Sequence, residues 1–138
     1  MTAEFDKMDP ELKTKLVAAL RSGKYIKWEG DLKFVEATIC RHCTMGVLAD
    51  LKYPNKWIER YERQNGMTME VPGLTLEGLG LTATQRNMIV KLNDWAQYGR
   101  RHLEQVGIPE EFLNKIDPDG TLEQTTFDHM ADFIENYF

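Results

Sequence analysis

The chain has 138 residues and a net charge of −5; 42% of its residues are hydrophobic and 28% are charged. This composition is typical of a globular protein, and the length favours one domain, residues 1–138, with a buried core. The negative net charge argues against nucleic acid as a partner, because binding a nucleic-acid backbone requires several Lys or Arg side chains to neutralise phosphates.

Neither a membrane segment nor an export signal is expected. No apolar stretch approaches the roughly 20 residues that span a bilayer. The N-terminal segment MTAEFDKMDP is acidic and lacks the apolar region of a signal peptide. The two cysteines, Cys40 and Cys43, are therefore expected to be reduced thiols. These features predict a cytoplasmic protein with no membrane partner.

The N-terminal segment predicts a helix. Asp9 is suited to cap its free N–H groups, and Pro10 suits the first helical position, where no N–H is needed. Gly23 is typical of a helix end because glycine readily adopts the left-handed conformation there. We therefore expect a helix over about residues 10–22.

A small antiparallel β element and a second helix are expected next. Residues 24–39 are rich in aromatic and β-branched side chains, and Glu29-Gly30-Asp31 interrupts them, which indicates two short strands joined by a turn. Residues 44–52 predict a short buried helix. Gly46 within it favours close packing against another backbone or a ligand, since glycine otherwise destabilises a helix.

The middle of the chain predicts one amphipathic helix and one short strand. Trp57, Ile58 and Tyr61 stand among charges at helical spacing, so a helix ending near Asn65-Gly66 is expected. Residues 67–81 contain four turn-forming residues and are expected to form a strand followed by a loop.

Three further helices are expected in the C-terminal half: one through about Tyr98, a short one from Pro109, and a final one over residues 127–138. The fold class is therefore predicted as α+β and mainly helical. We expect a single compact domain with a small antiparallel β element in its N-terminal third.

Four separated fragments have a specific order: LVAALRSGKY (16–25), CTMGVLADL (43–51), VKLND (90–94) and FDHMADFIENYF (127–138). They resemble a family of small uncharacterised proteins of tailed bacteriophages and prophages, whose pattern runs roughly ALRSGxY … CCLGVLCDL … LND … FxxIADxIE. The resemblance implies a phage-encoded protein in the cytoplasm of a bacterial host. Relative to that pattern, residues 95–124 are expected to be an insertion.

The segment Cys40-Arg41-His42-Cys43 is a candidate metal site. CxxC spacing with an intervening His offers sulfur and imidazole ligands that suit zinc. A closed site needs four ligands, and the chain has no second pair of this kind. The alternative is two buried thiols at the junction of a strand and a helix. No cofactor is expected.

Cys43 is also a candidate catalytic nucleophile. It precedes a predicted helix, whose N-terminal partial charge would lower the pKa of its thiol. It occupies the first Cys position of the family's CCLGV pattern, whereas Thr44 and Ala49 replace the other two cysteines. His102 or His129 would have to act as the base.

Asn93 and Asp94 are candidate ligand-binding residues. Both are polar residues within the apolar register of a predicted helix. Either they bind loop backbone groups and cap a neighbouring element, or they line a pocket and bind a ligand.

Four more residues are candidates for ligand or protein binding. Trp28 is an aromatic residue suited to an interface. Tyr98, Arg100 and Arg101 belong to a basic cluster that also contains Lys91 and His102. This cluster either contacts a phosphate-bearing ligand or an acidic protein, or forms a solvated helix end.

The favoured functional hypothesis is a phage accessory protein that acts by binding. It would inhibit a host defence protein or sequester a small nucleotide-like molecule. One alternative is a small enzyme that uses Cys43 or the Asn93/Asp94 region on a nucleotide or peptide. Another is a structural module of a phage assembly. The sequence leaves two roles for Tyr137 and Phe138: they either seal a contact between subunits of a homo-oligomer or close the chain's own core.

Overall fold

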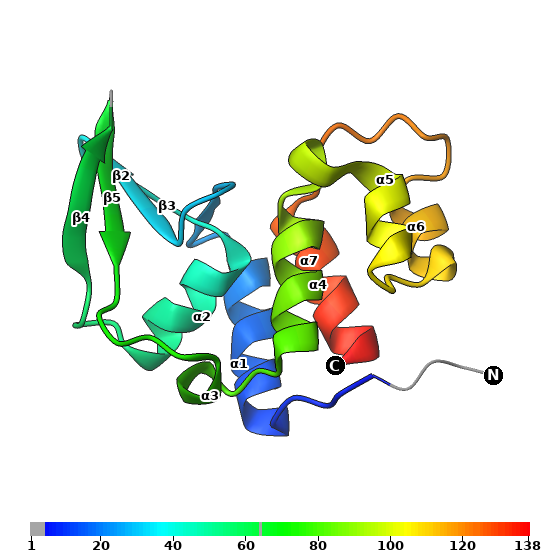
Figure 1. The fold of residues 1–138 in the computed structure, drawn as a ribbon, viewed down its shortest axis with the longest axis horizontal. Coiled ribbons are helices and arrows are strands. Elements are labelled where there is room, and N and C mark those ends of the chain that lie inside the picture. Colours follow the sequence, from blue (N-terminus) through cyan, green and yellow to red (C-terminus); the bar gives the residue numbers. More distant parts are fainter. Residues whose placement is uncertain (1–4, 64) are drawn as a thin grey trace.

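The computed structural model describes residues 5–63 and 65–138 (Figure 1). Within these residues the chain forms seven helices and one five-stranded sheet. This confirms the predicted α+β class and its mainly helical character. The helices and the sheet occupy opposite sides of the molecule in Figure 1.

Four helices pack around most of the hydrophobic core: α1 (Pro10–Arg21), α2 (Thr44–Lys52), α4 (Ala83–Asn93) and α7 (Phe127–Tyr137). Their fully buried side chains include Leu16, Val47, Leu48, Ile89, Leu92, Phe133 and Ile134. α1 and α7 lie side by side (Figure 1), and Arg21 of α1 donates to Asp132 at 2.6 Å and to Glu135 at 2.7 Å on α7. The start and end of the chain thereby form one packed unit.

The sheet has the strand order β1-β3-β2-β5-β4. Its strands are β1 (Ile26–Lys27), β2 (Lys33–Glu36), β3 (Ile39–His42), β4 (Ile58–Arg63) and β5 (Gly66–Glu70). All neighbouring strands are antiparallel except β1 and β3, which are parallel. The β4–β5 hairpin extends the β element beyond the N-terminal third and forms the outer edge of the sheet (Figure 1).

The helix expected around Ile58 and Tyr61 is wrong, because this segment is strand β4. A bulge between Glu59 and Tyr61 makes Ile58 pair with Glu70 and Tyr61 with Thr68. Glu70 and Thr68 are two residues apart and share one face of β5, so Ile58 and Tyr61 share that face too. The bulge therefore gives a strand the three-residue apolar spacing that is normally typical of a helix.

The helix expected to run to Tyr98 is interrupted at Asp94. α5 (Trp95–Gln105) follows, with a break at Gly99, whose φ is +78°. The loop expected before α4 contains one short helix, α3 (Leu76–Leu79), and the short helix after Pro109 is α6 (Glu110–Ile116).

The segment 95–124 contributes α5 and α6 to the fold. These two helices form a separate layer beside α7 (Figure 1), where the Phe112 ring lies 5.2 Å from the Phe133 ring between centroids. That the segment is an insertion stays a prediction. Phe138 is 2% exposed and packs on Phe133, so it closes the chain's own core.

Gly46 allows the close packing that its place in a helix predicts. A methyl group at this position would lie 1.8 Å from the carbonyl oxygen of Leu32. That carbonyl accepts from the N–H of Cys43 at 3.3 Å, directly before α2. The glycine therefore lets α2 lie against the loop that precedes β2.

Replacing Gly46 by Ala is expected to lower the free energy of unfolding by about 2–3 kcal/mol, because a backbone group has to move. Gly23→Ala is the matched control. Nothing lies within 4 Å of the added methyl group there, so only the positive φ of +76° costs stability, about 1 kcal/mol. Urea denaturation of both variants measures the difference. Equal losses would contradict the close approach at Gly46.

Candidate functional site

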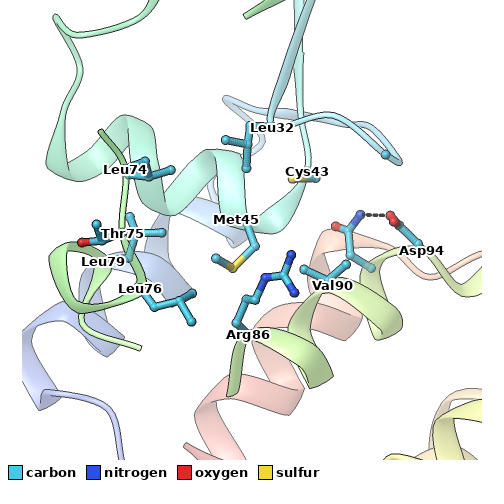
Figure 2. Close-up of a pocket in the computed structure, with 12 residues that line it drawn as sticks. Leu32, Cys43, Met45, Leu74, Thr75, Leu76, Leu79, Arg86, Val90 and Asp94 are labelled. Carbon is cyan, nitrogen blue, oxygen red and sulfur yellow. Dashed lines mark hydrogen bonds between the residues drawn. The ribbon is translucent and has the colours of Figure 1, made fainter. Parts of the chain in front are cut away.

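A cavity of about 430 Å³ lies between α2, α3, α4 and the loop before β2 (Figure 2). This volume falls in the range of about 300–1,000 Å³ that small-molecule sites occupy. Its walls are mostly apolar and are formed by Leu32, Met45, Leu74, Leu76, Leu79 and Val90. The polar groups at its surface come from Cys43, Thr75, Arg86, Asn93 and Asp94.

Arg86 supplies the positive charge of the cavity. Figure 2 shows its guanidinium directed between Met45 and Val90. The residue is exposed, and its side chain takes part in none of the ion pairs of the described residues. Its guanidinium therefore lines the cavity without forming an ion pair with a carboxylate of the described part of the chain.

A capping box at the start of α4 fixes the helical register that places Arg86 in the cavity. The hydroxyl of Thr82 accepts from the N–H of Gln85 at 3.1 Å, and the Gln85 side chain accepts from the N–H of Thr82 at 2.9 Å. Val90 follows Arg86 by four residues on the same face of α4, and Asp94 follows Val90 by four more, directly after the end of the helix.

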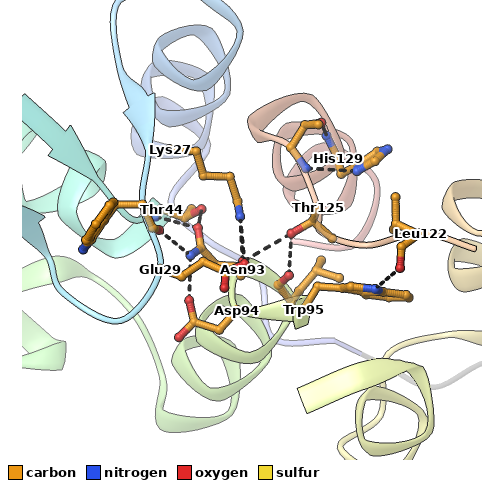
Figure 3. Close-up of polar contacts among 12 residues, drawn as sticks. Lys27, Glu29, Thr44, Asn93, Asp94, Trp95, Leu122, Thr125 and His129 are labelled. Carbon is orange, nitrogen blue, oxygen red and sulfur yellow. Dashed lines mark hydrogen bonds and ion pairs between the residues drawn. The ribbon is translucent and has the colours of Figure 1, made fainter. Parts of the chain in front are cut away.

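Asn93 ends α4 and is 1% exposed (Figure 3). Its side-chain oxygen accepts from the N–H of Thr44 at 3.0 Å and from the Thr44 hydroxyl at 2.7 Å. Its amide group donates to the carbonyl of Trp28 at 3.0 Å and to Asp94 at 2.9 Å. All four hydrogen-bonding positions of this amide are thus used within the protein.

The backbone around Asn93 is held from a second side. Lys27 donates to the carbonyl of Asn93 at 2.8 Å, and the hydroxyl of Thr125 donates to the carbonyl of Leu92 at 2.7 Å (Figure 3). These bonds connect the end of α4 with β1 and with the loop before α7. The side chain of Asn93 therefore binds backbone groups of neighbouring elements, which is the first of the two roles considered for it from the sequence.

Asp94 differs from Asn93, because part of its carboxylate is left for another partner. The side chain is 6% exposed, lines the cavity, and accepts from Asn93 through one oxygen. It occupies the position before α5 but makes no capping hydrogen bond to that helix. No ion pair of the described residues includes it, although buried carboxylates are usually paired.

Cys43 lines the cavity as a neutral thiol. Its sulfur accepts from the N–H of Gly46 at 3.4 Å at the start of α2. Burial raises the pKa of the thiol to about 11, so the lowered pKa expected from the helix N-terminus is wrong. His102 contacts Lys91 at 2.7 Å, and His129 closes a capping box with Thr126, so both histidines have other roles.

Both cysteines are free thiols, and Cys43 is buried. The expectation that Cys40 is buried too is wrong, because this residue is exposed on the sheet strand β3. Across residues 5–63 and 65–138, no group of three or more His, Cys, Asp or Glu side chains is arranged to hold a metal ion. Within the described residues, the fold therefore brings no further metal ligand to Cys40 and Cys43.

Trp28 does not line the cavity on α4, although its carbonyl accepts from the amide of Asn93. Its ring stacks on Phe34 at 4.8 Å, and the Arg41 guanidinium lies 5.5 Å from the ring centroid. The residue lines a second, more open cavity of about 580 Å³ beside Lys27 and the start of α7.

The other three binding candidates lie on α5 and do not line the α4 cavity. Tyr98 stacks on His102 at 5.0 Å. Arg100 donates to the carbonyl of Asp117 at 3.0 Å and to the side chain of Asn114, so its guanidinium holds the loop after α6. Arg101 is exposed.

Another buried polar cluster surrounds His42, which is 5% exposed and packs between the rings of Tyr25 and Trp57. Burial lowers the pKa of His42 to about 4, so the imidazole is neutral at pH 7. Asp50 accepts from the Tyr25 hydroxyl at 2.6 Å and from Trp57 Nε1 at 2.8 Å. This cluster joins the sheet to α2.

The structure thus brings Asn93, Asp94 and Cys43 together in one cavity and separates Trp28 and the α5 residues from it. The sequence analysis missed Arg86 and the apolar walls. The spacing of Arg86, Val90 and Asp94 was the one available signal, because it places these residues in a row on a helix.

No protein family, curated protein or solved structure matches this chain. In the described part of the chain, no helix is both long and apolar enough to cross a membrane.

Replacing Asn93 by Ala is expected to lower the free energy of unfolding by about 2–4 kcal/mol. The change leaves the N–H of Thr44 and the carbonyl of Trp28 buried without their partner, and each such loss costs about 1–3 kcal/mol. Asn87→Ala, at a position on α4 that takes part in none of these bonds, is the control. Thermal and urea unfolding measure both. A loss in Asn93→Ala no larger than in the control would contradict the role of Asn93.

Alkylation tests the state of the thiols. At pH 8, iodoacetamide is expected to label Cys40 and leave Cys43 unlabelled, since a thiol with a pKa near 11 carries little thiolate and is buried. Intact-mass measurement should show one label in the native protein and two in denaturant. Labelling of Cys43 as fast as Cys40 would contradict the buried, neutral thiol.

Proposed function

We propose that this chain is a binding protein that holds and sequesters a small nucleotide-like molecule in the cavity between α2, α3 and α4. The observation that carries the proposal is Arg86, a cation without a protein partner in the described residues at the wall of an apolar cavity of about 430 Å³. Such a cavity suits a ligand with an anionic group and a flat, largely apolar body.

The two parts of a nucleotide match the two kinds of surface in the cavity. A guanidinium forms paired, charge-assisted hydrogen bonds with phosphate oxygens, which supports Arg86 as the phosphate contact. The side chains of Leu32, Met45 and Leu76 provide the apolar surface that covers a base.

The chemistry of the lining residues favours binding over catalysis. Cys43 is neutral, and the amide of Asn93 is fully used in holding the fold. Neither therefore serves as the nucleophile or polar reactant that the enzyme hypothesis requires. A binding role needs only the cavity, Arg86 and Asp94.

The biological setting in this proposal rests on the resemblance to phage and prophage proteins. In a bacterial cytoplasm, such a protein would act as an accessory factor by lowering the free concentration of a host nucleotide. One observation favours inhibition of a host protein as a second candidate. Strand β4 is an edge strand whose Ile58 and Tyr61 are 46% and 44% exposed, and an unpaired edge can accept a strand from a partner.

Arg86→Ala is expected to weaken nucleotide binding by roughly 10- to 100-fold, because charge-assisted hydrogen bonds contribute about 1.5–3 kcal/mol. Arg101→Ala, which removes another exposed helical arginine outside the cavity, is the matched control and should bind as the wild type does. Isothermal titration calorimetry with nucleoside monophosphates and cyclic nucleotides measures the effect. The proposal fails if no nucleotide binds, or if both variants bind equally.

A further inference from the structure

The carboxylate of Asp94 lies in the cavity wall and accepts fewer hydrogen bonds than it can. Asp94 is only 6% exposed. Within the described residues, its carboxylate accepts one side-chain hydrogen bond, from the amide of Asn93. An aspartate before a helix usually caps that helix, yet this side chain makes no such bond to α5. Each carboxylate oxygen accepts about two hydrogen bonds, so part of the capacity of Asp94 stays available to a ligand.

Asp94 and Arg86 both line the same cavity. Asp94 is the residue that caps the end of α4, eight residues after Arg86, and Val90 lies between them in the sequence. At a rise of 1.5 Å per residue, their backbone positions are about 12 Å apart along the helix axis. The cavity therefore offers an acceptor at one end and a cation that reaches in between the apolar side chains of Met45 and Val90 (Figure 2).

Resting on the nucleotide-binding function proposed above, we propose that the ligand is a guanine nucleotide. Its base would donate to Asp94, and its phosphate would contact Arg86. Guanine carries two adjacent donors on its base-pairing edge, N1–H and the 2-amino group, which match the two oxygens of one carboxylate. Adenine presents a single amino donor beside an acceptor nitrogen, and that nitrogen would face the carboxylate without a proton between them.

The apolar side chains of the cavity provide a surface for a flat base. Leu32 and Met45 extend into the cavity on the side opposite Val90 (Figure 2). The thioether of Met45 is flexible and polarizable, so it adapts to the surface of an aromatic ring. Asn93 holds Asp94 through its amide and thereby fixes the direction of the carboxylate before the ligand binds.

Calorimetric titration of the full chain with the monophosphates of guanosine, adenosine and xanthosine tests this assignment. The wild type is expected to bind the guanosine compound at least 10-fold more tightly than either of the others. Asp94→Asn is expected to reverse the preference between guanosine and xanthosine. An amide offers one acceptor and one donor, and xanthine has a carbonyl where guanine has its 2-amino group.

The outcomes separate this inference from the proposed function. Wild-type protein that binds the adenosine compound as tightly as the guanosine compound overturns the guanine assignment and leaves nucleotide binding in place. Absence of binding to all three overturns both. A folded Asp94→Asn variant that keeps the wild-type order of affinities also overturns the role of Asp94. The wild-type titration decides the assignment even if this variant does not fold.

Discussion

The side chain of Asn93 is the interaction on which the rest of the site depends. Its oxygen binds the first residue of α2, and its amide binds the loop after β1 and the carboxylate of Asp94. One buried amide therefore fixes the distance between two helices and positions a neighbouring charge. Buried polar groups of this kind are costly unless every position is satisfied, and here all four are. The cavity lies between α2 and α4, and Asn93 of this junction is one of its lining residues (Figure 2).

This arrangement determines which groups are left to meet a ligand. Asn93 is fully used, and Cys43 is held neutral by burial, so the cavity offers little reactivity. Arg86 and Asp94 remain, both in the lining of the cavity and without ion-pair partners in the described residues. In the proposed complex, these two charged groups contact the polar parts of the ligand, and the apolar walls cover the rest of it.

Local signals in the sequence were sufficient to predict the helices whose ends they mark. Asp9 and Pro10 begin α1 as expected. Gly46 packs closely against a backbone carbonyl, as a glycine within a helix led us to expect. Strand β4 was misassigned because a bulge gives Ile58 and Tyr61 the spacing of a helix. Asn93 and Asp94 were recognised as a pair, but whether they hold the fold or bind a ligand depends on Thr44 and Trp28, which lie 49 and 65 residues away. Arg86 was missed for the same reason, because the cavity is formed by segments that no local pattern connects.

Native mass spectrometry of the protein purified from bacteria tests the central claim most directly, with spectra recorded before and after addition of mixed nucleotides. We expect one nucleotide-sized mass addition per chain, and loss of that addition when Arg86 is replaced by Glu. A clean mass of the chain alone under every condition would contradict a ligand cavity on α4. The exposed edge at β4 would then be the surface to examine for a protein partner.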